Sequence, residues 1–272
     1  MGLSFINCEN SGAITGNRTK WYGNDSYGGV GGIVGYCYYS GTGDQAGIIS
    51  CHNTGAISGY NMVGGIAGYC VDSSDDMLFA FEKNYNTGSI TGTRQVGGLV
   101  GYDSSMRVQN CYNTGAVDGA AREEFTGKLQ YIGGLVGYYS VGYYSTLTTG
   151  SCYNAGTITV ETGALNVGGA VGYVQNRVSF EHYYYLDTCV ETSNTYGTAL
   201  TAEEMTSDTD WKTNYVNFDS ATPIWTKDNN TSAKWYLPKL DDYSPYLKSQ
   251  SYVGVTGVSL EPETLTLLVG DM

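Results

Sequence analysis

A seven-residue motif, (Val/Ile)-Gly-Gly-(Ile/Leu/Ala)-(Val/Ala)-Gly-Tyr, recurs five times in this chain and constrains its fold more than any other feature. Its copies begin at Val30, Val63, Val96, Ile132 and Val167, at steps of 33, 33, 36 and 35 residues. Self-similarity with a period of about 20–50 residues is typical of solenoids, propellers and arrays. The chain is therefore expected to repeat one small structural unit.

A second motif, Cys-x-Asn-x-Gly-x-(Ile/Val), alternates with the first. Its copies begin at Cys8, Cys51, Cys111 and Cys152, with Asn84 in the cysteine position of another copy and His182 in that of a decayed last one. Asn-x-Gly predicts a tight turn, because both residues tolerate left-handed backbone angles. The short apolar runs on either side are strand-like.

Each period therefore offers about three short strands, one of which carries the whole glycine motif. Strand-sized runs without helical periodicity predict an all-β chain. The motifs are constant and the connectors vary in length, as stacked coils allow. The predicted fold is a parallel β-solenoid, or β-helix, and the general chirality of parallel crossovers favours a right hand.

Period-two alternation places Val96, Gly98, Val100 and Tyr102 on one face of the motif strand, and its other residues on the opposite face. Both faces are apolar, so this strand is expected to be covered on both sides. Five motif tyrosines are expected to stack along the coil at roughly 4.8 Å: Tyr36, Tyr69, Tyr102, Tyr138 and Tyr173.

Composition changes near residue 180, since 35 of the 39 glycines precede it and all four prolines follow it. Thr201-Ala202-Glu203-Glu204 is a capping box that predicts a short helix through Met205. We expect solenoid repeats over residues 1–187 and a C-terminal cap over 188–250 that covers the open strand edges. Residues 251–272 alternate like strands and are too short for a domain.

A net charge of −13 argues against nucleic acid as a partner and against docking on an anionic membrane. No run of 18 apolar residues predicts membrane insertion. The first residues lack the pattern of a secretory signal, so the chain is expected to be part of a longer protein with flanking domains. The seven cysteines recur at fixed repeat positions and are expected to be buried free thiols.

Together the two motifs resemble the GLUG-motif repeats of large bacterial surface proteins, including regions of immunoglobulin A peptidases and adhesin-like proteins. The resemblance covers residues 5 to about 187, and the segments 183–187, 201–205 and 235–240 are similar to those that close such arrays. Residues 258–271 look like the truncated start of a group 2 bacterial immunoglobulin-like domain. The resemblance implies an extracellular, secreted or cell-surface protein, a β-solenoid, and no catalytic residues in this region.

Candidate chemistry is sparse. The two histidines, His52 and His182, are explained by their repeat positions and lie outside any zinc motif. Gly41-Thr42-Gly43 touches a dinucleotide fingerprint but precedes a strand instead of a helix. The acidic loop of Asp72, Asp75 and Asp76, and the segment 228–232, lack the glycine and closing glutamate of a calcium hand, so no metal or cofactor is predicted.

Two surface features leave room for activity. Asp103, Asp118, Glu123 and Glu124 could form the carboxylate groove of a polysaccharide-cleaving enzyme on a β-helix scaffold, although none recurs on one strand face. Tyrosines after the first and fourth glycine motifs could contact a sugar or protein, or could pack over the solenoid wall: Tyr38, Tyr39, Tyr139, Tyr143 and Tyr144.

We therefore expect a non-catalytic structural or adhesive module, an extended stalk that binds a host glycan or protein ligand through repeated surfaces. The alternatives are a polysaccharide-active enzyme on the same scaffold and a passive spacer next to a peptidase domain.

Overall fold

The computed structural model describes residues 4–16, 28–41, 46–74, 79–119, 130–142, 146–161, 164, 166–206, 225–227 and 238–240. The chain divides into two compact units, Met1–Leu240 and Asp241–Met272, and the second lies outside the described residues. The expected start of an immunoglobulin-like domain at residues 251–272 lies there too.

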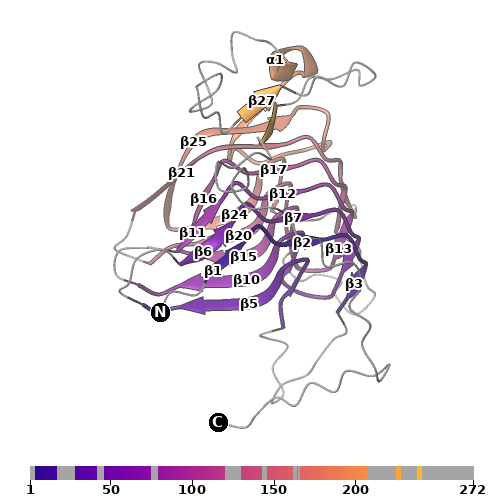
Figure 1. Ribbon diagram of the computed structural model, residues 1–272. Helices are drawn as coiled ribbons and strands as arrows, with labels where there is room; N and C mark the ends of the chain where they lie inside the picture. The colour runs from indigo at the N-terminus through magenta and orange to yellow at the C-terminus, as the bar shows by residue number, and fades with distance from the viewer. Residues whose placement is uncertain are drawn as a thin grey trace. The chain divides into compact units, whose positions relative to one another are not determined.

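Strands of successive coils lie side by side and form four parallel sheets (Figure 1). The eleven-stranded sheet contains β1 (Ser4–Ile6), β6 (Gly47–Ile49), β11 (Ala80–Glu82), β16 (Arg107–Gln109), β21 (Thr146–Asn154), β17 (Tyr112–Asn113), β12 (Tyr85–Asn86), β7 (His52–Asn53) and β2 (Glu9–Asn10), with β25 (Arg177–Leu186) and β26 (Thr198–Leu200) added beside β21.

The other three sheets have five strands each. The first short sheet is β3 (Ile14–Thr15), β8 (Ile57–Ser58), β13 (Ile90–Gly92), β18 (Val117–Gly119) and β22 (Ile158–Val160). The second short sheet is β4 (Val30–Gly31), β9 (Val63–Gly64), β14 (Gln95–Gly97), β19 (Tyr131–Gly133) and β23 (Val167–Gly168). The tyrosine sheet is β5 (Val34–Tyr39), β10 (Ala67–Asp72), β15 (Val100–Ser104), β20 (Val136–Ser140) and β24 (Val171–Gln175).

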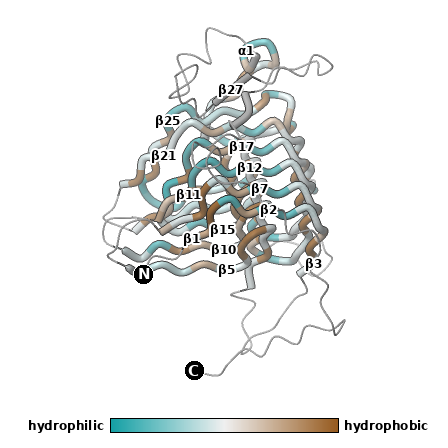
Figure 2. Tube along the Cα trace, in the orientation of Figure 1, coloured by the Kyte–Doolittle hydropathy of each residue, from teal (hydrophilic) through white to brown (hydrophobic). Residues whose placement is uncertain are grey.

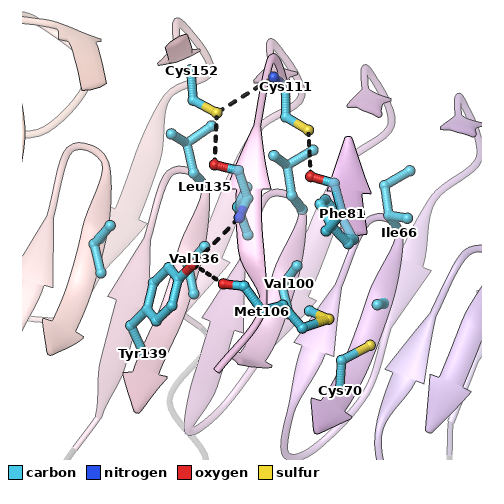
Figure 3. Packing of buried hydrophobic residues seen from close by; sticks show 14 of the residues in the cluster. Ile66, Cys70, Phe81, Val100, Met106, Cys111, Leu135, Val136, Tyr139 and Cys152 are labelled. Atoms are coloured by element: carbon cyan, nitrogen blue, oxygen red, sulfur yellow. Dashed lines mark hydrogen bonds between the residues drawn. The ribbon is translucent and has the colours of Figure 1, made fainter. Parts of the chain in front are cut away.

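The predicted parallel β-solenoid is confirmed. Equivalent motif residues pair in register from coil to coil, as Val63 does with Val30 on one side and Val96 on the other. A typical coil has five strand segments instead of the expected three or so. The chain bends within both motifs, and the apolar runs in the sequence did not indicate these bends. Side chains from the sheets meet inside in one hydrophobic core that includes Ile66, Phe81 and Leu135 (Figure 3).

The prediction of a single strand through the glycine motif is wrong. β14 ends at Gly97 and β15 begins at Val100, so Gly98 and Leu99 turn the chain from one sheet into the next. Because of this turn, Leu99 and Val100 are both fully buried. A Cβ at Gly98 would lie 2.2 Å from the carbonyl oxygen of Gly134 in the next coil, which explains the requirement for glycine.

The second motif builds a buried ladder of asparagine side chains. In the first four coils the Nδ2 donates to the Oδ1 of the asparagine in the next coil, at 2.7–2.8 Å, and to the glycine carbonyl two residues onward. The ladder contains Asn10, Asn53, Asn86, Asn113 and Asn154, and the last four are fully buried. Hydrophilic colour at β7, β12 and β17 in Figure 2 follows this row.

Left-handed backbone angles do not fall on Asn-x-Gly, contrary to the prediction. They fall on the residue before the cysteine position, as at Ser50, Lys83 and Asn110 with φ of 55°, 57° and 52°. The motif glycine is needed for close stacking instead: a Cβ at Gly88 would lie 2.0 Å from the carbonyl oxygen of Gly55 in the preceding coil.

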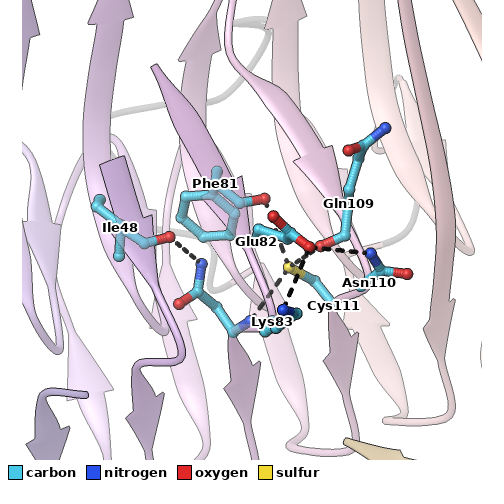
Figure 4. A network of polar contacts seen from close by, with 8 residues as sticks. Ile48, Phe81, Glu82, Lys83, Gln109, Asn110 and Cys111 are labelled. Carbon is cyan, nitrogen blue, oxygen red and sulfur yellow. Dashed lines mark hydrogen bonds and ion pairs between the residues drawn. The ribbon is translucent and has the colours of Figure 1, made fainter. Parts of the chain in front are cut away.

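The cysteine position also joins adjacent coils. The Cys111 thiol donates to the Phe81 carbonyl oxygen at 3.8 Å and accepts from the Asn84 N–H at 3.3 Å. Asn84 makes the same two kinds of bond: its Nδ2 donates to the Ile48 carbonyl at 2.7 Å, the bond that Figure 4 draws at Ile48, and its Oδ1 accepts from the Cys51 N–H at 2.8 Å. One donor and one acceptor are what the position needs, so asparagine substitutes for cysteine there.

All seven cysteines are free thiols, as expected. Tyr183, not His182, occupies the last cysteine position, because Tyr183 pairs with Cys152 in the strand register. His182 instead has the left-handed backbone, with φ of 55°.

The C-terminal end of the solenoid carries the predicted short helix, α1 (Ala202–Thr206). The capping box is confirmed: the Thr201 N–H donates to Glu204 Oε2 at 2.8 Å, and the Glu204 N–H donates to Thr201 Oγ1 at 3.2 Å. Met205 is buried against Tyr112, Tyr153 and Tyr184, the aromatic stack that follows the cysteine position. Beyond the helix, β27 (Trp225–Lys227) and β28 (Pro238–Leu240) pair antiparallel.

Candidate functional site

The tyrosine sheet has an inner and an outer row of side chains. Cys37, Cys70, Asp103 and Tyr139 stand in register and are buried. Their neighbours one position earlier, the motif tyrosines, therefore point to the opposite, outer face of the sheet. Sequence alone had left open which face points inward.

The motif tyrosines form a continuous ladder on this outer face, which we call the tyrosine ladder: Tyr36, Tyr69, Tyr102, Tyr138 and Tyr173. Successive ring centroids are 5.2, 4.8, 4.7 and 5.3 Å apart. The expected row of tyrosines at this spacing is thus confirmed, and within it the rings of Tyr102 and Tyr138 lie nearly parallel, at 17°. Tyr131 from β19 packs edge-on against Tyr138, at 4.9 Å and 86°.

Exposure is greatest at the β5 end of the tyrosine ladder. Tyr36 and Tyr38 are each 52% exposed, whereas the later tyrosines are half-buried by their neighbours. Tyr38 shares the outer face of β5, where its hydroxyl accepts a hydrogen bond from Ser73 at 2.9 Å. Two exposed rings on one face of a strand offer an apolar surface edged by hydroxyl groups.

The phenols in the middle of the ladder stay neutral over a wide pH range. Burial raises the pKa of Tyr138 to about 12, helped by the phenols of Tyr102, Tyr131 and Tyr173. Burial also raises the pKa of Tyr102. The Tyr138 hydroxyl donates to Gln175 Oε1 at 2.7 Å. The ladder therefore offers aromatic faces and hydrogen bonds, not charge.

Of the five tyrosines named from sequence, the structure places one on this surface. Tyr38 is exposed, whereas Tyr39 and Tyr139 are 5% and 0% exposed and lie in strands β5 and β20, not in loops. Tyr39 packs on Phe79, and the Tyr139 hydroxyl accepts from the Val108 N–H at 3.4 Å. Tyr143 and Tyr144 lie outside the described residues.

The alternation of strand side chains explains these two errors. Cys37 and Tyr39 share one face of β5, and Tyr36 and Tyr38 share the other. A cysteine expected in the core therefore implied a buried Tyr39 and an exposed Tyr36. This signal was present in the sequence and points to the tyrosine ladder as the candidate surface.

The two histidines have structural partners in different parts of the solenoid. His52 lies 3.5 Å from Glu9 Oε1 and stacks on Tyr85 at 4.8 Å and 3°. His182 Nδ1 lies 3.3 Å from the Tyr184 hydroxyl. Both occupy strands of the eleven-stranded sheet, β7 and β25.

Three of the candidate acidic residues lie in the described part of the chain, and they do not share one exposed face. Asp72 caps its own turn, accepting from the N–H groups of Ser74 and Phe79 at 2.8 Å each. Asp103 is buried in the core and Asp118 is half-buried in β18. Asp75, Asp76, Glu123, Glu124 and the segment 228–232 lie outside the described residues.

Asp103 is the one buried carboxyl group on the inner row of the tyrosine sheet that no ion pair compensates among the described residues. Its Oδ1 accepts from the Met106 N–H at 2.9 Å, and its Oδ2 has no hydrogen-bond partner there. Burial raises the pKa of Asp103 well above its ordinary value. The pKa of the adjacent Cys70 thiol is raised by its hydrogen bond with Cys37 and by burial.

The described part of the chain contains neither a membrane-spanning helix nor a metal-binding cluster of side chains. No helix there has the length and apolar character to cross a membrane. No group of three histidine, cysteine, aspartate or glutamate side chains in those residues could hold a metal ion.

Comparison with known proteins yields a likeness of fold. No family model and no curated protein matches the sequence. The crystal structure of a Bacteroides ovatus protein, described there as a proposed immunoglobulin A1 protease, superposes with a TM-score of 0.54 at 20% identity. The match covers 80% of this chain and 65% of that chain, so less than two thirds of the matched protein is represented. At this identity the likeness shows that the two chains share a fold.

Proposed function

We propose that this chain is a non-catalytic structural and adhesive module of a secreted or surface-displayed bacterial protein, and that its tyrosine ladder is the ligand-contacting face. The observation that carries the proposal is the pair of exposed rings on β5, Tyr36 and Tyr38, which continues into a row of four further tyrosines in contact with one another. Aromatic side chains at surfaces contribute large contact areas at low conformational cost.

The neutrality of the ladder suggests the chemistry of the ligand. Phenol groups are uncharged at neutral pH, and the strand register places a ring about every 5 Å. Flat neutral rings edged by hydroxyl groups suit the apolar faces of sugar rings, so we favour a glycan over a charged polymer. The net charge of −13 agrees, because it disfavours acidic ligands.

The fold supports a stalk-like role. Each coil contacts its neighbours through backbone, asparagine and thiol hydrogen bonds, so the coils form a stiff stack that can hold a surface at a distance. The likeness to the Bacteroides ovatus structure and the resemblance to GLUG-motif repeats are consistent with a module of a larger extracellular protein.

A glycan and mucin array tests the proposal, with Tyr36→Ala and Tyr38→Ala as the variants. Each should weaken binding about tenfold, since removing one well-packed aromatic contact costs about 1–2 kcal/mol. Ile6→Ala is the matched control, because Ile6 is 55% exposed on the eleven-stranded sheet, away from the ladder.

The same assay separates the alternatives when release of reducing sugar is measured on every bound glycan. Sugar release would favour the polysaccharide-active enzyme and overturn the non-catalytic assignment. Binding that survives both tyrosine substitutions would place the ligand elsewhere. An array without any binding would favour a passive spacer.

A further inference from the structure

The first coil of the solenoid, β1 to β5, carries features that every later coil uses to stack on the coil before it. In the later coils the motif glycine is required by the preceding coil: a Cβ at Gly55, Gly88, Gly115 or Gly156 would lie 2.0–2.1 Å from a glycine carbonyl oxygen there. At Gly12 the added Cβ meets, among the residues that the structure describes, only Asn10 Oδ1, at 3.7 Å. No described neighbour of Gly12 therefore comes close enough to require glycine at this position.

The asparagine ladder also has an open position in the first coil. It is directional, because each Oδ1 accepts from the Nδ2 of the preceding coil. Asn10 Oδ1 accepts only the Gly12 N–H, at 3.3 Å, among the described residues. The ladder therefore ends at β2 in an acceptor that is directed away from the rest of the coil stack.

Apolar side chains of the first coil are also less covered than their equivalents. Phe5, Cys8, Ile14, Val30 and Ile33 are only partly buried, whereas Ile48, Cys51, Ile57, Val63 and Ile66 in the same positions are almost fully buried. On the eleven-stranded sheet Ile6 is 55% exposed, whereas Ile49, its register partner in the next coil, is partly buried. Unpaired strand edges with apolar contents are where further strands add.

We infer that the edge formed by β1 to β5 is a docking surface for one further coil of the same repeat, stacked in tandem and in parallel register. That coil would donate an asparagine Nδ2–H to Asn10 Oδ1 and place a glycine carbonyl over Gly12. This inference goes beyond the proposed function, since it concerns the end of the solenoid and not its outer face.

A second copy of this chain fits the edge less well. Two copies joined end to end at β1 to β5 would bring the Asn10 Oδ1 acceptors together without a donor. Joined head to tail, the docking coil would offer Asn154, whose Nδ2 already donates to the Gly156 and Gly169 carbonyls at 3.0 Å. Beyond Asn154, Tyr185 occupies the next position of the ladder.

The test adds a coil and asks whether Gly12 becomes necessary. Residues 80–106 are fused directly ahead of Ser4, because Arg107, which normally follows this coil, has the register position of Ser4. In the original chain, Gly12→Ala should leave the melting temperature within about 1 °C, whereas Gly55→Ala should lower it by more than about 5 °C. In the extended chain, Gly12→Ala should lower it as much as Gly55→Ala does.

The glycine of the added coil that is copied from Gly88 is the matched control, since it now lies at the free end and should tolerate alanine. Reaction of Cys8 with a thiol reagent should also slow at least tenfold in the extended chain, relative to its rate in the original chain. Equal effects of Gly12→Ala in both chains, or a large effect in the original chain alone, would overturn the inference. A concentration-dependent dimer that Gly12→Ala dissociates would identify a second copy as the occupant instead.

Discussion

Asp103 differs in chemistry from the residues at the equivalent position of the other coils. It stands between Cys70 and Tyr139 in the inner row, positions that elsewhere carry thiol, phenol or aliphatic groups. The groups that face it are the Met106 N–H, the Cys70 thiol and the Tyr139 phenol, with the Asp72 carboxyl nearby. None of these groups is a cation that could stabilise a carboxylate in the core.

Asp103→Asn should therefore flatten the pH dependence of stability. Burial raises the folded-state pKa of Asp103 above its ordinary value of 3.8, so the folded chain retains a proton that the unfolded chain has lost. The contribution of this group to the unfolding free energy is greatest below that ordinary value and is lost as the pH rises through the folded-state pKa. We expect the variant to gain roughly 1–3 kcal/mol relative to the parent between pH 4 and pH 7.

Urea denaturation of both proteins across this pH range measures the effect. Only the difference between the two curves reports on Asp103, because the other carboxyl groups titrate in both. Parallel curves would mean that Asp103 is ionised in the folded state.

At the scale of elements, the asparagine ladder explains why such short strands are stable. β2, β7, β12 and β17 are two residues long, and such strands supply few backbone bonds of their own. Side-chain amides at 2.7–2.8 Å continue the pairing between coils next to them. The bend at Gly98 and Leu99 then directs the chain into the next sheet.

Asn86→Leu should lower the unfolding free energy by roughly 2–4 kcal/mol, because it removes two ladder bonds and leaves the buried Gly88 carbonyl with fewer donors. Asn113→Leu should behave alike. The double variant should lose at least about 1 kcal/mol less unfolding free energy than the two single variants lose together. Two leucines side by side leave fewer hydrogen-bonding groups without a partner than the two single substitutions do in total. Denaturation of the four proteins gives this coupling, and strict additivity would contradict a connected ladder.

At the scale of the whole solenoid, the two ends of the described coil stack differ. The C-terminal end is closed by β25, β26 and α1, with Met205 fully buried against a stack of tyrosines. The end at β1 to β5 retains open glycine and asparagine positions. A further coil can therefore be added at the β1 to β5 end of the stack and not at the C-terminal end.

Met205→Ala should destabilise the C-terminal end by roughly 2–4 kcal/mol, the usual cost of truncating a buried methionine. Tyr153 and Tyr184 should become more accessible, so hydrogen exchange should increase first in β25 and β26. Glu203→Ala on the exposed side of the same helix is the control and should change little. Unchanged exchange in Met205→Ala would show that the helix does not stabilise this end.

The sequence by itself determined the period, the parallel solenoid, the stacking of the motif tyrosines, the free thiols and the capping box at Thr201. These features depend on local chemistry repeated at a constant spacing, which a single sequence displays directly. Alternation along β5 also contained the information that Tyr36 and Tyr38 face away from Cys37.

Tertiary structure alone decided where the chain turns and which side chains serve neighbouring coils. The bend within the glycine motif, the left-handed residues before the cysteine position and the burial of Tyr39 and Tyr139 depend on backbone contacts with the adjacent coil. Asn86 reads locally as a turn residue, but its amide bonds are made across coils, to residues 27 and 33 positions away. Such contacts arise only when the coils stack, which is why local patterns predicted the fold better than the site.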